Sequence, residues 1–530
     1  MNRFPDLIRK YAFKHPDKKA THFEGRDFTY AQFRDRIQAM GQVLADKGVK
    51  PGDRVAYLGQ NSHWLVEMYY VPCVIGGILV PLNYRLSEDE MVDVIADCTP
   101  QVLVVDRHFV PRAAALMDRC PSLQHLIFAD WDDTAEDLPS GTPSYDALIA
   151  ATPKVADDAF DDRASHSNDT MIIFYTSGTT GVPKGVMLSH ANLLVNATGS
   201  GHLYGYVDTD VLLLSGPLFH LGTGSRVYTA IAYGTTMVIQ PRFEVEETMR
   251  MIQDQRITTM TLVPTMLAMI MDHPRFSDFD FSSIRCLTYG ASPMPLALME
   301  RALDAIPGIV FCQGYGMTET SPVLTVLTPA DHMPGNPMIG KLGTVGKPVV
   351  YADVRIVDEN DNPVPTGQSG EVIIRGPQVM NGYWNRPEDT AQAMRGGFYH
   401  TGDAGFLDED GYLTLVGRTK EMIISGGENV YPIETENALS KHPAVAQAAV
   451  IGVPHEKWGE MVYAVVALHD GKEASEEDLI AFCRQKIADY KAPRGVTIWD
   501  GALPLSPTNK IDKKAIRAAV LAARTERQNA

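Results

Sequence analysis

The segment YTSGTTGVPKGVMLSH, residues 175–190, has the composition of a phosphate-binding loop. Eleven of its residues, starting at Thr176, include three glycines, four Ser or Thr hydroxyls and one lysine. Glycine frees the backbone to aim several N–H groups at anionic oxygens, and the hydroxyls and the lysine supply further donors. A Walker A loop is excluded, because Pro183 and Lys184 stand where that motif needs Gly-Lys after Gly178. The segment therefore predicts a phosphate site of a different kind.

Three later segments also carry residues suited to nucleotide and metal binding. They read QGYGMTETSP at 313–322, GFYHTGDAGFLDEDGYLTLVGRTKEMIISGGENVYP at 397–432 and LPLSPTNKIDKKAIR at 503–517. Glu319 is a candidate Mg²⁺ ligand, because a carboxylate together with nucleotide phosphates is a usual way to hold this ion. The chain has no H-E-x-x-H, G-x-S-x-G or G-x-G-x-x-G motif, so hydrolase and dehydrogenase interpretations lose support.

In order and spacing, these four segments resemble the acyl-adenylate-forming superfamily over nearly the whole chain. That superfamily contains acyl- and aryl-CoA ligases, amino-acid adenylation domains and beetle luciferases. The resemblance implies that a carboxylic acid and ATP give an acyl-AMP and pyrophosphate, and that coenzyme A then displaces AMP. Joining the acid to AMP provides the good leaving group that a free carboxylate lacks. The implied cofactors are ATP, Mg²⁺ and coenzyme A.

The resemblance assigns catalytic roles residue by residue. The phosphate loop would hold the departing pyrophosphate, with Thr176 and Lys184 as donors, and Glu319 would bind Mg²⁺. Lys510 would bridge the carboxylate and the α-phosphate, because positive charge is needed where two anions meet. Asn509 replaces the glycine usual before this lysine, and asparagine tolerates left-handed backbone better than other non-glycine residues. The remaining loop residues of the site are Ser177, Gly178, Thr179 and Thr180.

The resemblance also implies a site for the nucleoside part of ATP. Tyr315 would stack on adenine, and Thr318 would contact a phosphate. Asp403 in HTGD would accept hydrogen bonds from both ribose hydroxyls, and Arg418 in GRTK would lie near the same ribose. Small residues are needed where backbone approaches a flat ring. The small residues assigned to this site are Gly290, Ala291, Gly314 and Gly316.

A coenzyme A site is implied mainly by residues near the C-terminal end. Gly426 and Gly427 match the segment that lines the pantetheine tunnel of the family. Trp458 matches an aromatic residue that stacks on the adenine of coenzyme A in aryl-CoA ligases. An arginine of those ligases maps onto Ala492, so the nucleotide contacts depart from the family pattern. The other candidate contacts are Tyr490 and Arg85.

The acid is expected to bind along PLFHLGTGSR, residues 217–226. Domains that activate α-amino acids usually carry an aspartate just after the aromatic residue of this stretch, and this chain has none there, so amino acids are disfavoured. His220 matches the gate or wall histidine of CoA ligases, with a packed core histidine as the alternative. Arg226 could pair a second carboxylate, but a monocarboxylate is favoured. A mostly apolar pocket, with room left by its glycines, would be lined by His220, Leu221, Gly222, Thr223, Gly224 and Tyr289.

The scaffold that positions these residues is predicted from hydrophobic patterns. Apolar runs bounded by turn residues alternate with helical patterns such as EVEETMRMIQDQRI and SPMPLALMERALDAI, which predicts an α/β fold with largely parallel sheets. The loop at 175–190 follows one such run and precedes a helix-like stretch. The predicted strands are RVAYLG at 54–59, QVLVVD at 101–106, MIIFYTSG at 171–178, TMVIQ at 236–240 and IRCLTYGAS at 284–292.

Two changes of pattern divide the chain. From about residue 350, charged segments with Gly and Pro predict short antiparallel strands in a small barrel-like part. After residues 412–432, the order helix, strand, strand, helix, strand predicts a compact α+β domain. We therefore predict a large N-terminal AMP-binding domain, 1–419, and a small mobile C-terminal domain, 420–530. By resemblance, Lys420 is the hinge on which the small domain turns between the half-reactions.

Bulk properties exclude several classes of partner. The formal net charge of −18 disfavours nucleic acid and anionic membrane surfaces. Six scattered cysteines predict neither a zinc site nor a disulfide framework and fit a reducing compartment. The apolar stretch 64–83 contains Glu67 and two prolines, so it predicts a buried helix leading into a core strand rather than a membrane span. We expect a cytoplasmic protein with small-molecule partners, and a homodimer is left open.

These observations predict an AMP-forming acid–CoA ligase that takes a monocarboxylate, with a medium- or long-chain fatty acid favoured. One alternative is an aryl acid of the cinnamate or benzoate type. Another is an acyl-AMP ligase that loads a carrier protein, against which Trp458 and the lack of an appended carrier domain argue. A non-catalytic binding paralogue is disfavoured by Lys510, Glu319 and Asp403.

Overall fold

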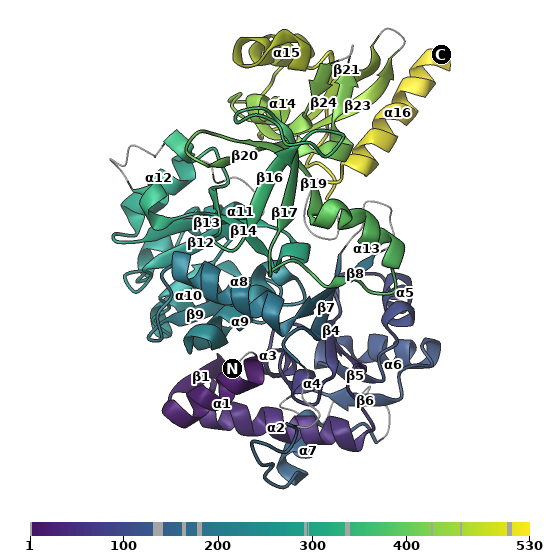
Figure 1. Ribbon diagram of the computed structural model, residues 1–530. Coiled ribbons are helices and arrows are strands. Elements are labelled where there is room, and N and C mark those ends of the chain that lie inside the picture. Colours follow the sequence, from purple (N-terminus) through teal and green to yellow (C-terminus); the bar gives the residue numbers. More distant parts are fainter. Residues whose placement is uncertain are drawn as a thin grey trace. The chain divides into compact units, whose positions relative to one another are not determined.

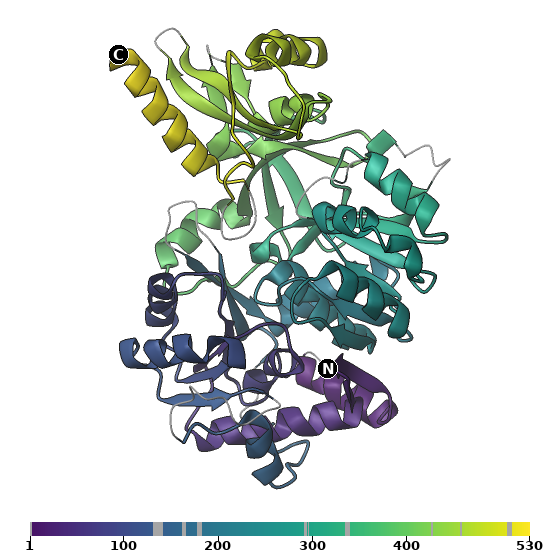
Figure 2. The same cartoon turned by 180° about the vertical axis from the view of Figure 1, so that it is seen from behind.

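A computed structural model describes residues 3–130, 141–161, 166–176, 183–290, 294, 296–333, 340–425, 428–455, 458–505 and 511–529 (Figure 1, Figure 2). The chain divides into two compact units. The first is Met1–Asp353 with Ile374–Tyr399, and the second is Val354–Ile373 with His400–Ala530. The predicted mixed α/β class, with a small C-terminal domain, is confirmed. The predicted boundary at 419/420 falls inside the second unit, and a domain division at that point stays a prediction.

One sheet of the first unit is built mainly from apolar runs in the N-terminal part of the chain. Its strands are β3 Arg54–Leu58, β4 Ile78–Pro81, β5 Val102–Val105, β6 His125–Phe128, β7 Thr170–Thr176, β8 Lys184–Ser189 and β18 Gly382–Tyr383, in the order β18-β8-β7-β4-β3-β5-β6. The strands from β7 to β6 in this order pair in parallel, and β8 pairs antiparallel with both β7 and β18. Every residue of β5 is buried, as expected of a parallel strand covered on both faces. The neighbouring helices are α2 Tyr30–Asp46, α3 His63–Met68, α4 Val71–Val74, α5 Glu88–Cys98, α6 Val110–Arg119 and α7 Tyr145–Ala151.

A second sheet of the first unit carries the glycine-rich segments. Its strands are β1 Lys19–Phe23, β2 Arg26–Thr29, β9 Val211–Leu214, β10 Thr236–Ile239, β11 Thr259–Thr261, β12 Cys286–Gly290, β13 Val310–Gly316, β14 Val323–Leu327 and β15 Lys347–Pro348, in the order β15-β14-β13-β12-β11-β9-β10-β1-β2. The helices of this part are α1 Phe4–Lys14, α8 His190–Leu203, α9 Leu221–Tyr233, α10 Val245–Asp254, α11 Pro264–Met271 and α12 Leu296–Ala305, and α13 Pro387–Ala393 follows β18. Helices α8 and α9 pack side by side and against strands of this sheet (Figure 1).

The predicted barrel-like part forms a separate sheet of short strands. They are β16 Asp353–Val357, β17 Gly370–Arg375, β19 Tyr399–Leu407 and β20 Leu413–Arg418, in the order β16-β17-β19-β20. Strands β19 and β20 pair antiparallel, as the turn-rich sequence predicts.

The C-terminal part follows the predicted order of elements. Its strands are β21 Ile423–Ser425, β22 Glu428–Val430, β23 Val445–His455, β24 Gly459–Leu468 and β25 Gly495–Ile498, and its helices are α14 Pro432–Leu439, α15 Glu476–Lys486 and α16 Lys513–Asn529. Along β23, Val450 packs toward α14 and α15, whereas Ala449 and Ile451 pack toward α16. Both views show α16 on the face of this sheet opposite α14 and α15 (Figure 1, Figure 2). Neighbouring side chains of a strand point to opposite faces, so one apolar strand supplies two cores.

The five predicted strands are confirmed as β3, β5, β7, β10 and β12, and the two quoted helical patterns as α10 and α12. One expectation is wrong: residues 184–189 are not loop but strand β8. Val186 and Leu188 are buried, and pairing with β7 satisfies the backbone of the segment. The preceding glycines and proline hid this alternation in the sequence.

The apolar stretch 64–83 folds as predicted, as short helices α3 and α4 followed by the core strand β4. Glu67 within it is fully buried, and its Oε1 lies 2.5 Å from Nε of Arg36. Among the described residues, none of the helices combines the length and the hydropathy that crossing a membrane requires.

Candidate active site

The predicted phosphate loop leaves the sheet at the end of β7 and returns at the start of β8. Thr176 lies directly opposite Lys184 in the register of this hairpin. The hairpin therefore brings the two predicted catalytic donors side by side. The loop residues between them, Ser177, Gly178, Thr179 and Thr180, lie outside the described residues.

Lys184 belongs to a polar cluster that spans three segments of the first unit. Its Nζ lies 2.9 Å from Oδ1 of Asp389 and 5.1 Å from the ring centroid of Tyr383. The hydroxyl of Tyr383 donates a hydrogen bond of 3.0 Å to Oε1 of Glu319. Burial raises the pKa of Tyr383, and the charge of Glu319 raises it further, so the hydroxyl remains a donor. Two predicted catalytic residues, Lys184 and Glu319, thus share one tyrosine.

Glu319 fits the predicted role of Mg²⁺ ligand. It is half-buried in the short helix η3, Thr318–Thr320, and its backbone carbonyl accepts a hydrogen bond of 2.9 Å from the N–H of Met380. Its backbone and its side chain are therefore both held in place. Mg²⁺ is usually bound by one or two carboxylates together with phosphate oxygens and water, and this carboxylate lies near a lysine that suits phosphate. The bound ion would neutralise phosphate charge.

The predicted adenine segment is a surface of backbone. Gly290 pairs with Gly314 across β12 and β13, and a Cβ at Gly290 would lie 2.5 Å from the carbonyl oxygen of Gly314. A Cβ at Gly316 would lie 1.7 Å from the carbonyl oxygen of Pro322. Neither position has room for a side chain. Half-buried Tyr315 lies between the two glycines of β13, and its stacking on adenine stays a prediction.

The two predicted ribose residues meet in the second unit. Asp403 on β19 and Arg418 on β20 are directly opposite in register, and Oδ1 of Asp403 lies 2.8 Å from Nε of Arg418. Asp403 is buried, whereas half of the Arg418 side chain is exposed. The backbone N–H of Asp403 also donates to the hydroxyl of Thr401. The ion pair with Arg418 orients the carboxylate, and carboxylate oxygens can accept hydrogen bonds from hydroxyl groups.

The start of α9 contains the predicted acid-binding residues. His220 is exposed and caps the helix, because its Nδ1 accepts a hydrogen bond of 3.1 Å from the N–H of Gly222. The alternative of a packed core histidine is therefore wrong. The expected free space beside Gly224 is also absent, because a Cβ there would lie 2.2 Å from the hydroxyl of Tyr69. Leu221 is buried and Thr223 is half-buried.

Tyr289, the remaining predicted pocket residue, belongs to a buried aromatic cluster. Its hydroxyl lies 3.0 Å from Nε2 of His332, whose Nδ1 lies 2.8 Å from the carbonyl oxygen of Thr328. Burial lowers the pKa of His332, so the ring is neutral, with Nδ1 donating to Thr328 and Nε2 accepting from Tyr289. The ring of Tyr289 also packs edge-on against Phe311.

Two family models match the chain. The family model of the AMP-binding enzymes matches residues 8–384, and that of the AMP-binding enzyme C-terminal domain matches residues 434–510. The chain belongs to the AMP-binding enzyme family. The predicted resemblance to acyl-adenylate-forming enzymes is confirmed.

Relatives of this AMP-binding enzyme match along almost their whole length. A feruloyl-CoA synthase of Amycolatopsis sp is 37% identical over 509 residues, which are 95% of this chain and 96% of the relative. An indoleacetate–CoA ligase of Aromatoleum aromaticum is 36% identical over 516 residues, 97% of this chain and 98% of the relative. The solved structure of o-succinylbenzoate CoA synthetase from Bacillus subtilis, in complex with its acyl-adenylate, has a TM-score of 0.80 and 30% identity over 96% of each chain. The predictions of an AMP-forming acid–CoA ligase and of ATP, Mg²⁺ and coenzyme A are confirmed at this level.

The predicted coenzyme A contacts of the AMP-binding enzyme are not gathered in one unit. Trp458, in the second unit, stacks on His455 with 4.3 Å between ring centroids and lies 5.6 Å from the guanidinium of Arg494. Tyr490 in the same unit is 40% exposed. Arg85 belongs to the first unit and is exposed. Their roles toward coenzyme A stay predictions.

Several predicted residues of the AMP-binding enzyme lie outside the described residues. They are Ala291, Gly426, Gly427 and Lys510, together with the side chain of Lys420. Sequence reasoning missed Tyr383 and Asp389, which contact the predicted catalytic residues. A signal existed in NGYWNRPED, residues 381–389, where a turn is followed by aromatic and acidic residues. Strand pairing of β18 with β8 brings this segment beside the strand that follows the phosphate loop.

Proposed function

We propose that this AMP-binding enzyme is an aryl-acid–CoA ligase, which joins an aromatic carboxylic acid to coenzyme A with cleavage of ATP to AMP and pyrophosphate. The observation that carries the proposal is the names of three of the relatives that match along almost their whole length, which specify feruloyl, indoleacetate and o-succinylbenzoate groups. These acids are all aromatic. The sequence-based preference for a fatty acid therefore gives way to the aryl alternative.

The aromatic cluster around Tyr289 supports this choice. Its ring and those of Phe311 and His332 pack within 6.3 Å of one another, centroid to centroid, in tilted and edge-on arrangements. Aromatic rings prefer such geometries, so a cluster of this kind suits an aromatic substrate bound beside it. The cluster adjoins β12 and β13, whose ends carry the predicted adenine segment.

In the proposed first half-reaction, a carboxylate oxygen of the acid attacks the α-phosphorus of ATP. A new oxygen–phosphorus bond forms, the bond to the β-phosphate oxygen breaks, and pyrophosphate leaves. Lys184 would stabilise the pyrophosphate, Glu319 would hold Mg²⁺, and Lys510 would lie where carboxylate and phosphate meet. Prearranged charge at the point where charge develops is usually the largest contribution to catalysis.

In the proposed second half-reaction, the thiolate of coenzyme A attacks the acyl carbon, and AMP leaves with the electron pair of the broken bond. We propose that the domain 420–530 turns on Lys420 between the two half-reactions, so that Lys510 and the coenzyme A segment reach the acyl group in turn. Proline holds φ near −65° and would exclude one of two hinge conformations. Lys420→Pro should retain pyrophosphate release and lose most thioester formation. Unchanged thioester formation from supplied acyl-AMP would locate the pivot elsewhere.

The test of the proposed function is a panel of acids assayed for AMP release with and without coenzyme A. Cinnamate, ferulate, indoleacetate and benzoate are compared with octanoate and palmitate. We expect kcat/KM to be at least about tenfold higher for an aromatic acid than for either fatty acid. An aromatic ring and an alkyl chain differ in size and shape by several methylene groups, and a pocket can discriminate even one methylene group by about tenfold or more. Higher kcat/KM for palmitate would contradict the proposal.

The same assay separates coenzyme A from a carrier protein as acceptor. Acyl transfer to coenzyme A is compared with transfer to a phosphopantetheinylated carrier domain. AMP release that depends on the carrier and not on coenzyme A would favour the alternative acyl-AMP ligase. A cytoplasmic location and a homodimer stay predictions.

A further inference from the structure

Arg226 is a buried cation without a counter-ion. It lies in α9 with 5% of its surface exposed, and its Nε forms no hydrogen bond. In the part of the chain that the structure describes, it makes no ion pair with a carboxylate. Its guanidinium carbon lies 4.8 Å from the ring centroid of Tyr204.

The polar groups of Tyr204 and Tyr206 lie close enough to Arg226 to interact with it, but they are neutral and do not balance its charge. The hydroxyls of Tyr204 and Tyr206 are buried and form no hydrogen bond of standard geometry within the described segments. Burial raises the pKa of both tyrosines, and the charge of Arg226 opposes that rise, so both hydroxyls stay protonated. The charge of Asp210 also raises the pKa of Tyr206. This carboxylate is paired with Arg285, whose Nε lies 2.8 Å from its Oδ1.

Such an arrangement is unfavourable for the protein alone. A buried charge without a partner costs several kcal/mol, by order of magnitude, and arginine cannot escape the cost by losing its proton. One ring face returns only about 0.5–2 kcal/mol. A negative partner from outside the chain would remove the penalty.

The position of Arg226 indicates which ligand could supply the negative group. It lies in residues 217–226, the stretch assigned to the acid substrate. The hydroxyl of Tyr204 lies against β13, because a Cβ at Gly314 would be 2.3 Å from it. Gly314 in turn pairs with Gly290 of the predicted adenine segment. Arg226 is therefore close to the place where acid and nucleotide are expected to meet.

We infer that Arg226, assisted by the hydroxyls of Tyr204 and Tyr206, binds an oxyanion that the acid substrate carries at the end remote from its activated carboxylate. This inference rests on the proposed function and narrows it to aromatic acids with a second carboxylate. The planar guanidinium can donate two parallel hydrogen bonds to a carboxylate, and the two hydroxyls are further donors. A neutral phenol or amide would accept hydrogen bonds but would leave the buried charge uncompensated. The sequence-based preference for a monocarboxylate is thereby revised.

The experiment uses pairs of acids that differ only in charge at the far end. Terephthalate, 4-carboxyphenylacetate and 4-carboxycinnamate are each compared with the corresponding 4-carbamoyl acid and with the unsubstituted acid. The readout is kcat/KM for AMP release that depends on coenzyme A. For the full-length wild-type enzyme and the best-fitting length, we expect the carboxylate to exceed the carbamoyl acid by about 100-fold, because a buried charge would otherwise stay unpaired.

Variants then assign this preference to the arginine. Arg226→Met keeps a long side chain without charge and should reduce the ratio to about one or below it. Arg226→Lys keeps the charge without the planar fork and should retain the direction of the preference with a smaller ratio. Arg250→Met is the matched control, because it removes an exposed arginine, and it should leave the ratio unchanged. If Arg226→Met does not fold, Arg226→Lys and the wild-type ratio decide the question.

The failures of the two proposals can be told apart. If no aromatic acid in any of the three forms is used, the proposed function fails. If unsubstituted aromatic acids are used and the wild-type enzyme does not prefer the carboxylate at any length, the inference about Arg226 is overturned while the proposed function stands. A preference that survives unchanged in Arg226→Met would also overturn it, by placing the oxyanion on another group.

Discussion

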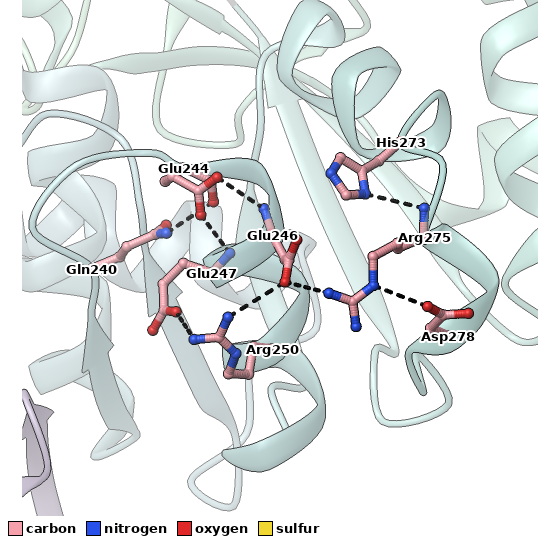
Figure 3. Close-up of polar contacts among 8 residues, drawn as sticks. All are labelled: Gln240, Glu244, Glu246, Glu247, Arg250, His273, Arg275 and Asp278. Atoms are coloured by element: carbon pink, nitrogen blue, oxygen red, sulfur yellow. Dashed lines mark hydrogen bonds and ion pairs between the residues drawn. The ribbon is translucent and has the colours of Figure 1, made fainter.

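Arg226 and the arginines around α10 occupy opposite extremes of charge placement in the first unit. Around α10, Arg250 lies 2.6 Å from Glu247, and Arg275 lies 2.6 Å from Glu246 and 3.0 Å from Asp278 (Figure 3). About half of each of these two arginine side chains is exposed. Arg226 is almost completely buried and pairs with no carboxylate among the described residues.

The contrast separates exposed charges, which affect stability little, from a buried charge, which destabilises the folded protein unless a ligand pairs with it. Exposed ion pairs contribute about 0–1 kcal/mol each, because water solvates the partners nearly as well as they solvate each other. Substitutions in the cluster of Figure 3 should therefore change the free energy of unfolding little. A buried arginine without a carboxylate partner is unfavourable when no ligand is bound, so its presence indicates binding rather than stability.

Buried histidines in the same unit strengthen the contrast. Burial lowers the pKa of His63, His190 and His332, so each of these rings stays neutral. The fold thus avoids a buried positive charge wherever the side chain can lose its proton. Arginine cannot lose its proton, so Arg226 is an exception among the buried side chains that the structure describes in this unit.

The largest expected effect concerns Lys510, a second charge that we assign to the reactants. Lys510→Ala should reduce acid-dependent ATP–pyrophosphate exchange by about 10³-fold, because a group that stabilises transition-state charge is worth roughly 3–4 kcal/mol. Thioester formation from supplied acyl-AMP and coenzyme A should persist. Equal loss of both half-reactions would show that Lys510 is not specific to adenylation.

The stability of Arg226→Met tests the contrast directly. Without a ligand, this variant should be about 1–3 kcal/mol more stable than the wild-type protein, because an uncompensated buried charge is replaced by an apolar chain of similar length. The free energy of unfolding in urea is the measurement. A loss of stability of similar size would mean that Arg226 has a structural partner, and the contrast with Arg250 would break.

Buried His190 predicts a pH dependence of stability. Burial lowers its pKa to about 3, aided by the charge of Arg3 and opposed by Asp6. Below pH 6.5 the unfolded chain binds a proton at this ring and the folded chain does not, so stability is lost as pH falls from 6.5 toward 3. Between pH 7 and pH 5 the loss should be about 2 kcal/mol from this residue.

His190→Asn should flatten that part of the profile, measured by urea unfolding at several pH values. His63 and His332 act in the same direction, so the variant should keep part of the pH dependence. Its profile should still be less steep than that of the wild-type protein, because the contribution of His190 is removed. An equally steep profile in His190→Asn would show that this ring is protonated in the folded protein.

A smaller effect is expected for the cross-strand pair of the second unit. Asp403→Asn should raise KM for ATP about tenfold, because charge-assisted hydrogen bonds are worth roughly 1.5–3 kcal/mol and an amide retains part of that. Arg418→Met removes the partner 2.8 Å away and should change KM for ATP less. A larger change in KM for the acid than for ATP would argue against a role at the ribose.

The smallest effect is expected in the cluster of Figure 3. Arg250→Met should change the free energy of unfolding by less than about 0.5 kcal/mol and leave kcat unchanged, since surface pairs are weak and screened by salt. Thermal unfolding at low and at high ionic strength is the measurement. A change above 2 kcal/mol would mean that exposed pairs carry weight in this protein, and the argument from Arg226 would weaken.

The sequence by itself determined the local elements and the types of residue at the site. Alternating apolar runs predicted β3, β5, β7, β10 and β12, because burial of side chains at a fixed period depends only on neighbouring residues. Glycines, hydroxyls and a lysine in close succession predicted the phosphate loop for the same reason. The register of β19 against β20 brings Asp403 opposite Arg418. A short hairpin sets this register, so it depends mostly on residues that are near one another in the sequence.

Only the tertiary structure decided which distant residues meet and which stay unpaired. Tyr383 reaches Glu319, and Asp389 reaches Lys184, because β18 pairs with β8 across a long stretch of chain. The space that Gly224 was expected to leave is filled by Tyr69, which no local pattern relates to it. The helical periodicity of α9 does not predict that Arg226 is buried beside two tyrosines. Nor does it predict that no carboxylate among the described residues pairs with this arginine. Desolvation and charge pairing depend on every element that packs around a side chain, and that packing is set by contacts far apart in the sequence.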